Sequence, residues 1–312
     1  MKNEFYYPSA NQSDNINVTE WVPEGEIKGI LQVSHGMAEY IDRYDEFASY
    51  LSARGYYVAG QDHLGHGKSV SHNDDLGFFH ETAGNTHVVG DIGELRRIIQ
   101  ERYPDLPYYM LGHSMGSFLT RQYLQTNGSG VSGAIIMGTG HKSAPILHAG
   151  RLLCRMIALF KGWRCRSPLI NGLGLGGYNR SFQPSRTNVD CISKDEKIVD
   201  AYVKDPLCTF VFTINGYYQM FGGMLNLTSR AKVDKMPKEM PVLLVSGDRD
   251  PVGNFGREVQ KVYRQYLDCG MKDVRLKLYQ GDRHEILNET DRQQVYEDLY
   301  YWLEEKRVAT DK

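Results

Sequence analysis

Apolar residues along the chain form two kinds of segment, short continuous runs and longer stretches with helical spacing. The continuous runs predict buried strands at 27–34, 56–59, 108–112, 133–138, 242–246 and 274–279. The helical spacing predicts helices at 44–54, 88–103, 114–125, 257–267 and 292–306. Two early β-rich runs, 5–7 and 16–21, are expected to add an antiparallel edge. Strands that alternate with amphipathic helices are typical of an α/β fold, with a mostly parallel central sheet flanked by helices.

This alternation stops between about His141 and Pro237 and resumes afterwards. An interruption of that length inside a sheet protein indicates an insertion that covers the sheet. We therefore expect an α/β core built from residues 1–140 and 230–312, with a mainly helical cap, or lid, at 141–229.

Composition and charge narrow the class of protein. With 312 residues, 41% hydrophobic and 24% charged, the chain is an ordinary globular protein of one large or two small domains. Its net charge of −2 gives no field that would attract nucleic acid. The five cysteines are odd in number and scattered without a CxxC, which argues against a disulfide framework or a zinc site. No apolar signal segment or membrane-length apolar run is present, so a cytoplasmic location is expected.

The main chemical motif is GHSMG at residues 112–116, a GxSxG sequence. In a nucleophile elbow of this kind the serine lies on a sharp, strained turn between a strand and a helix, and the glycines avoid collisions with nearby backbone. A predicted strand precedes the motif and a predicted helix follows it. Ser114 is therefore the expected nucleophile.

A serine hydroxyl needs a base, and the base needs an acid to orient it. In this arrangement the chain order is serine, acid, histidine. His141 and His148 follow Ser114, but no Asp or Glu lies between the serine and either of them. His284, just after the predicted strand 274–279, is the histidine that satisfies the order.

The acid should follow an earlier strand, and the sequence after 242–246 offers both Asp248 and Asp250. Spacing alone barely separates the two. The oxyanion hole needs two backbone N–H donors, one from the residue after the nucleophile and one from a loop after an early strand. Met115 and Met37 are the expected donors. No metal or organic cofactor is needed for this chemistry.

Several motifs resemble the monoacylglycerol lipase and lysophospholipase group of α/β-hydrolases. They are HGMAEY at 35–40 with Arg43 and Tyr44, DHLGHGKS at 62–69, GHSMG at 112–116, GDRD at 247–250, and His284. The resemblance covers nearly the whole chain outside the cap. It implies that the acid is the last residue of GDRD, Asp250, and that the protein is a carboxylic ester hydrolase.

The cap carries the expected substrate determinants. Residues 106–189 contain nine basic side chains and no acidic one. Within them 146–160 predicts an amphipathic helix that packs as a lid, contacts lipid surfaces or anionic head groups, or does both. Aromatic and Met side chains at 210–225 predict either an acyl-binding wall or plain cap core. The expected substrate is an ester with a medium or long acyl chain, of monoacylglycerol or lysophospholipid type.

Two other functions fit the same fold. An aminopeptidase or amidase would need an acidic cluster to hold the substrate amine, and the acid-free segment argues against one. A non-catalytic binding protein would usually lack a triad member, whereas this chain keeps all three. A GxGxxG at 172–177 lacks the strand and helix of a nucleotide site, and is interpreted as a flexible cap loop.

Overall fold

The computed structural model describes residues 1–174 and 177–310. Its centre is an eight-stranded sheet with the order β1-β2-β4-β3-β5-β6-β7-β8. The strands are β1 (Lys2–Pro8), β2 (Asn15–Trp21), β3 (Gly29–Ser34), β4 (Tyr56–Gln61), β5 (Tyr108–His113), β6 (Gly133–Met137), β7 (Val242–Gly247) and β8 (Val274–Tyr279). β1 and β2 pair antiparallel, β2 joins β4 antiparallel, and the remaining pairs are parallel. The predicted α/β class and its antiparallel edge are confirmed.

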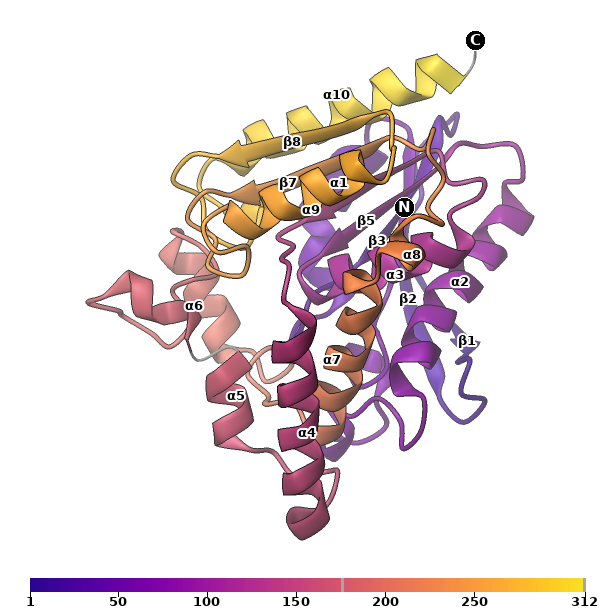
Figure 1. The fold of residues 1–312 in the computed structure, drawn as a ribbon. Helices are drawn as coiled ribbons and strands as arrows, with labels where there is room; N and C mark the ends of the chain where they lie inside the picture. The colour runs from indigo at the N-terminus through magenta and orange to yellow at the C-terminus, as the bar shows by residue number, and fades with distance from the viewer. Residues whose placement is uncertain (175–176, 311–312) are drawn as a thin grey trace.

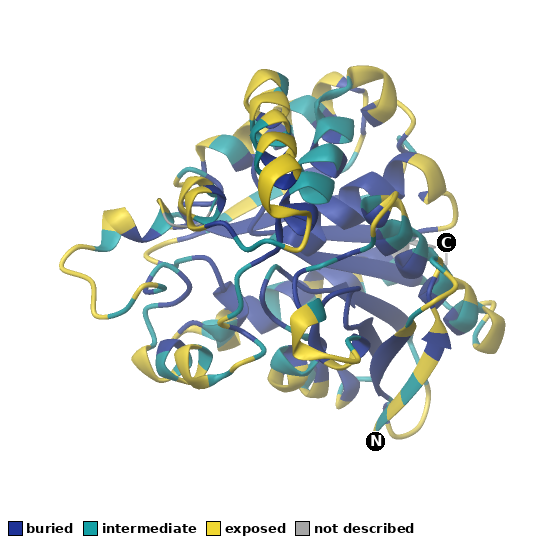
Figure 2. Ribbon diagram, turned by 90° about the horizontal axis from the view of Figure 1, so that it is seen from below, coloured by how far each residue is buried: buried dark blue, intermediate teal, exposed yellow. Residues whose placement is uncertain are grey.

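Both faces of the sheet are apolar. Successive side chains on a strand point to opposite sides, so a continuous apolar run supplies apolar side chains to both faces. In β5, Tyr108 and Met110 join one core cluster, while Tyr109 and Leu111 join the other. The helices that cover the first face are α2 (Gly84–Arg102), α3 (Met115–Asn127) and α9 (Arg257–Asp268). Those that cover the second are α1 (Asp45–Ser52) and α10 (Arg292–Thr310). Figure 2 shows the buried sheet in dark blue, with exposed positions on the surrounding helices.

The strand order decides where a site can form. β3 lies between β4 and β5, so the chain moves outward from β3 in both directions. Open parallel sheets bind ligands beyond the carboxyl ends of their strands, near such a reversal. The segments that follow β3, β5, β6, β7 and β8 all leave from that edge, and these segments carry the predicted site residues.

The predicted interruption is occupied by additional helices. They are α4 (Ala144–Lys161), α5 (Pro168–Gly174), the short 3₁₀ turn η4 (Tyr178–Phe182), α6 (Glu196–Lys204), α7 (Ile214–Thr228) and α8 (Arg230–Val233). In Figure 1 α4, α5 and α7 lie together below the sheet, with α4 and α7 side by side. α4 confirms the helix predicted at 146–160. Within the described residues, no helix is both long and apolar enough to cross a membrane.

The interpretation of 172–177 as a cap loop is wrong in part. Gly172 and Gly174 belong to the last turn of α5, because Ile170 is buried and Tyr217 donates a hydrogen bond of 2.7 Å to Asn171, so that the helix is anchored on α7. Residues 175 and 176 lie outside the described residues.

Candidate active site

Ser114 lies between β5 and α3 in a strained backbone conformation. Its φ of 52° and ψ of −118° are unusual for a residue with a side chain. Its amide donates a 3.0 Å hydrogen bond to the carbonyl of Met137 at the end of β6, which holds the turn against the sheet. The hydroxyl is therefore presented at the carboxyl edge of the sheet, at the amino end of a helix.

Two glycines allow other segments to approach this turn closely. A Cβ on Gly116 would lie 2.0 Å from the carbonyl oxygen of Ser34 in β3. A Cβ on Gly36 would lie 3.0 Å from the Cβ of Ser114. Any larger residue at either position would push the loop after β3 away from the serine.

His284 and Asp250 form a buried pair from two different loops. Nδ1 of His284 lies 3.0 Å from Oδ1 of Asp250, and the two residues are 9% and 0% exposed. Ser246 Oγ, at 2.9 Å, and the amide of Val252, at 2.9 Å, donate to the Asp250 carboxylate. The His284 ring packs on His113, the residue before Ser114, with 4.7 Å between ring centroids.

Asp248 has a different environment. Its Oδ1 accepts a 2.8 Å hydrogen bond from the amide of Gly281, in the loop that leads to His284. This contact joins the ends of β7 and β8, and it gives Asp248 a structural partner instead of the imidazole. Of the two acids that spacing left open, Asp250 is the one beside His284.

The predicted oxyanion donors flank the serine. Met115 is the first residue of α3, and amides in the first turn of a helix have no acceptor within the helix. Met37 is half-buried in the loop after β3, next to Gly36. Among the described residues no hydrogen bond is donated by the Met37 amide. Both amides therefore have free donor capacity at the edge where Ser114 lies.

A buried charge network behind these residues went unnoticed in the sequence. Glu39 accepts hydrogen bonds from Tyr44 (2.9 Å) and the Gly36 amide, and lies 3.0 Å from Nδ1 of His113. Arg43 contacts Glu39 at 3.0 Å and forms a bidentate pair with Glu285 at 2.8 and 2.7 Å. The network therefore links the loop after β3 to the residue next to His284. Its one sequence signal is the i,i+4 pair of Glu39 and Arg43 within the family motif.

The charge of Asp250 sets the protonation of His284. Burial lowers the pKa of His284, but the attraction of Asp250 outweighs it and raises this pKa above the usual 6.5. A base must be neutral to accept a proton. We expect kcat/KM to fall as the pH decreases through a value above 6.5. A pH profile from 5 to 9 with a soluble ester measures this, and an acidic limb below 6.5 would contradict it.

A second histidine cluster includes His35, the first residue after β3. His35, His63 and His66 are fully buried, with ring centroids 4.2 Å apart for His35–His63 and 5.1 Å for His35–His66. Burial lowers the pKa of each, to about 3 for His66. Within the described residues, no group of His, Cys, Asp or Glu is arranged to hold a metal ion.

These neutral histidines predict acid lability. Because the folded pKa is lower than the unfolded value, the unfolded chain binds more protons, and stability is present above pH 6.5 and lost as the pH falls below it. For His66 the loss is about 1.4 kcal/mol per pH unit. His66→Gln should therefore lose less unfolding free energy between pH 7 and pH 5 than the wild type does in urea titrations. An equal loss in both proteins would contradict this.

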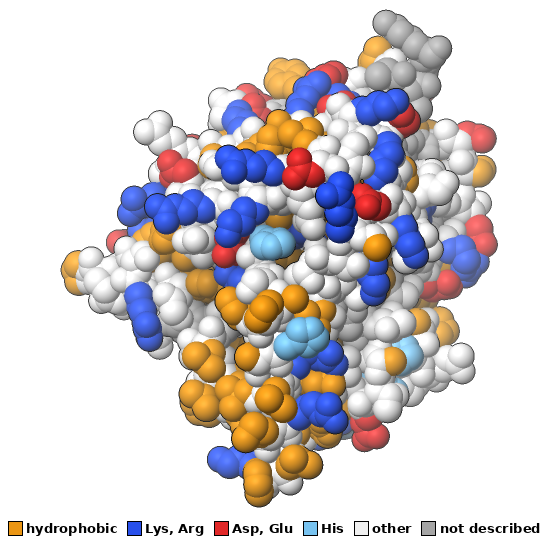
Figure 3. All heavy atoms as spheres, in the orientation of Figure 1, with side chains coloured by type: hydrophobic (Ala, Val, Ile, Leu, Met, Phe, Trp, Pro, Cys, Tyr) orange, Lys and Arg blue, Asp and Glu red, His pale blue; other side chains and the backbone are white. Residues whose placement is uncertain are grey.

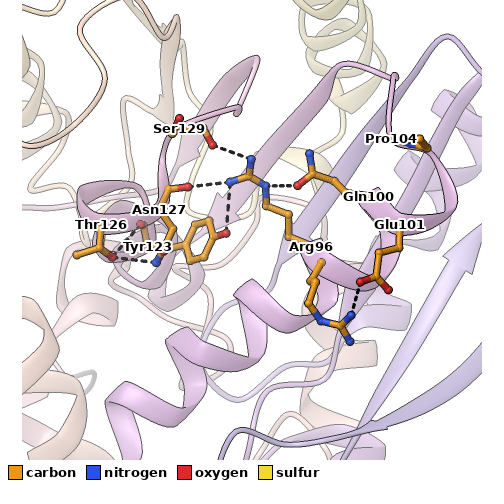
Figure 4. Close-up of a pocket in the computed structure, with 9 residues that line it drawn as sticks. Arg96, Gln100, Glu101, Pro104, Tyr123, Thr126, Asn127 and Ser129 are labelled. Atoms are coloured by element: carbon orange, nitrogen blue, oxygen red, sulfur yellow. Dashed lines mark hydrogen bonds and ion pairs between the residues drawn. The ribbon is translucent and has the colours of Figure 1, made fainter.

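A surface hollow lies away from these residues. It has a volume of about 610 Å³ and lies between α2 and the end of α3, and Figure 4 shows its polar lining. Four hydrogen bonds occupy the Arg96 guanidinium there, to Gln100, Tyr123 and the carbonyls of Asn127 and Ser129. The lining contains none of the predicted catalytic residues, so this hollow has no part in the chemistry.

Comparisons with known proteins identify the family of the chain. The family model described as serine aminopeptidase, S33, matches residues 25–291. The chain is 27% identical to the monoacylglycerol lipase of Mycolicibacterium smegmatis, over 91% of this chain and 90% of the other. It is 28% identical to the human monoglyceride lipase, over 93% and 86%.

A solved structure is similar to this chain over nearly its whole length. The highly thermostable carboxyl esterase from Bacillus coagulans, crystallised in complex with glycerol, superposes with a TM-score of 0.91 at 31% identity. The superposition covers 98% of this chain and 99% of the esterase. The resemblance seen in the sequence motifs is confirmed: the chain belongs to the serine aminopeptidase S33 family and is a monoglyceride lipase-like hydrolase with the α/β-hydrolase fold.

Proposed function

We propose that the protein hydrolyses carboxylic esters through a covalent acyl-enzyme formed on Ser114. The observation that carries the proposal is the buried pair of Asp250 and His284, 3.0 Å apart, which packs on the residue next to the strained serine. Ser114 attacks the ester carbonyl and His284 takes its proton, then returns it to the leaving alcohol. Asp250 fixes the imidazole tautomer. The amides of Met37 and Met115 stabilise the oxyanion, by about 3 kcal/mol each. Water then releases the acid.

The substrates we propose are esters with medium or long acyl chains, of monoacylglycerol or lysophospholipid type. The cap (141–229) supplies an apolar surface for such a chain. Phe212 and Tyr217 are fully buried in it, while Phe210, Tyr218 and Phe221 are partly exposed. The first group is cap core, and the second packs against it with part of its apolar surface exposed. The names of the similar lipases and esterase support ester hydrolysis.

Hydrolysis of p-nitrophenyl esters from acetyl to palmitoyl tests the proposed preference for medium or long acyl chains. We expect kcat/KM to be highest for a medium or long chain, with monoacylglycerols and lysophospholipids then compared at that length. A preference for acetyl over decanoyl esters would refute the acyl-chain proposal while leaving the serine chemistry intact.

An aminopeptidase is the second candidate, because the family model carries that description. Such an enzyme needs unpaired carboxylates to hold the substrate amine. The buried acids behind the site, Glu39 and Glu285, are both ion-paired with Arg43. Aminoacyl p-nitroanilides distinguish the candidates. Cleavage faster than that of the best ester would favour the peptidase.

We also propose that the cap contacts lipid surfaces through α4. Large apolar side chains are exposed on α4 and on the segment that follows it. They are Ile146, Leu152, Met156, Leu159, Phe160, Trp163, Leu169 and Leu173. Figure 3 shows hydrophobic side chains gathered at this end of the molecule, with basic ones beside them. Exposed Arg155 and Lys161 add positive charge on the same helix. A patch of apolar and basic side chains fits an anionic membrane surface.

The tip of α4 should dominate this binding. Leu159 and Phe160 are 81% and 88% exposed, and each would contribute about 1.5–3 kcal/mol when buried in lipid. We expect Leu159→Ser with Phe160→Ser to weaken binding to vesicles that contain anionic lipid by at least about tenfold. Leu267→Ser, an exposed leucine on α9, is the matched control in flotation assays. Equal binding by all three proteins would contradict the proposal.

A further inference from the structure

One segment of the cap contacts the loops on both sides of the serine. This segment, residues 190–208, contains α6 and is called the strap below. In Figure 1 α6 lies apart from α4, below the ends of β7 and β8. Its contacts extend to the loop that carries His284 and to the loop that carries Met37.

The strap pairs with the backbone at His284 itself. The amide of His284 donates a 3.2 Å hydrogen bond to the carbonyl of Cys191, and the amide of Glu285 donates one of 2.7 Å to the carbonyl of Ile192. Arg283 donates to the carbonyls of Asp190 and, at 3.0 Å, Ser193. The backbone of the catalytic loop is therefore fixed by the cap rather than by the sheet alone.

Lys194 inserts a positive charge into an acidic cluster in that loop. Its Nζ lies 2.5 Å from Oδ1 of Asp282 and 2.9 Å from Asp291, and its amide donates 2.9 Å to Glu289. Asp282 and Glu289 are fully buried. Burial raises the pKa of Asp282 to about 6, and Lys194 opposes that rise. Removing one partner from a buried ion pair leaves an uncompensated charge, so Lys194 is an electrostatic link between strap and loop.

The other end of the strap holds the oxyanion loop. The hydroxyl of Tyr202 donates a 2.9 Å hydrogen bond to the carbonyl of Ala38, the residue after Met37. Ala38 has a positive φ of 52°, a conformation that is strained for a residue with a side chain and that persists only when neighbouring groups stabilise it. The Tyr202 ring also packs on the Arg43 guanidinium at 4.9 Å. Tyr40 donates to Asp205 at 2.7 Å.

We propose that the strap sets the position of His284 and of the Met37 amide relative to Ser114, with Lys194 and Tyr202 as its positioning residues. The reason is geometric: one continuous segment is bonded to both loops, so it fixes the distance between the base and the oxyanion donor. Misplacement by about 1 Å can cost roughly 100-fold in rate. The inference rests on the proposed function, because it needs these residues to be the base and the donor.

Four variants test the inference. Lys194→Met removes the charge, Lys194→Arg keeps it, and Tyr202→Phe removes only the hydroxyl and keeps the ring on Arg43. Lys272→Met is the control, because Lys272 is a surface lysine paired with exposed Glu239. Each variant is assayed for kcat and KM on a soluble p-nitrophenyl ester. Amide hydrogen exchange is followed over residues 36–40 and 282–289.

We expect Lys194→Met and Tyr202→Phe to lower kcat by about 10- to 100-fold with KM nearly unchanged. Lys194→Arg should recover most of the kcat lost in Lys194→Met, and Lys272→Met should match the wild type. Exchange should quicken at 282–289 in Lys194→Met and at 36–40 in Tyr202→Phe. If Lys194→Met does not fold, Tyr202→Phe alone decides.

Wild-type kcat and exchange in both strap variants would overturn the inference. A loss confined to KM would also overturn it, since it would indicate a role in substrate binding. A wild type that hydrolyses no ester, with exchange still quickened in the variants, would refute the proposed function and leave the strap as a clamp on these loops.

Discussion

Replacing Ser114 with alanine is expected to lower kcat for ester hydrolysis by about 10⁶-fold, because the acyl-enzyme can no longer form. The backbone at this position is already strained, with a φ of 52°, and alanine carries the same Cβ as serine. The variant should therefore fold and melt like the wild type. Initial rates on the best p-nitrophenyl ester measure the loss, with a melting curve as the control. Residual activity within about tenfold of the wild type would mean that another residue attacks the ester.

Replacing Asp250 with asparagine is expected to lower kcat by about 10⁴-fold, because an amide favours the wrong tautomer of His284. The carboxylate is fully buried, and the charge of His284 helps to keep its pKa below the usual value despite burial. An amide at this position leaves the base without its counter-charge. Steady-state kinetics at the pH optimum give the comparison.

Asp248→Asn is the matched control for this change. Asp248 receives a hydrogen bond from the Gly281 amide, and an asparagine oxygen accepts that bond equally well. Its kcat should stay within about tenfold of the wild type. If Asp248→Asn were the more damaging of the two, the role of the acid would pass to Asp248.

The core of the fold was predictable because its strands are nearly continuous apolar runs. The side chains of Tyr108–Leu111 enter two apolar clusters in alternation, so the whole segment is hydrophobic in the sequence. The choice of His284 over His141 and His148 came from chain order, since no acid lies between Ser114 and either of the earlier histidines.

The cap was harder to predict, for a physical reason. α5 and α6 are short, and they are held by contacts with distant segments, such as Tyr217 with Asn171 and Lys194 with Asp282. Periodicity carries no information about such partners. α4 was predicted as an amphipathic helix, and the side chains that it exposes include large apolar ones as well as basic ones.

The charged residues behind the site were not predicted either. Glu39 and Arg43 are ordinary surface residues by type, and only the fold buries them together with Glu285. The choice between Asp248 and Asp250 likewise needed the family resemblance, because two residues of spacing on one loop do not determine which carboxylate turns toward the imidazole.

Intact-protein mass spectrometry after incubation with a fluorophosphonate probe tests the central claim most directly. The probe reacts with a serine only where a base and an oxyanion hole activate it. We predict that the wild type gains one adduct, that peptide mapping locates it on Ser114, and that Ser114→Ala gains none. A wild type that stays unmodified while folded, or an adduct that persists in Ser114→Ala, would contradict the assignment of Ser114 as the nucleophile.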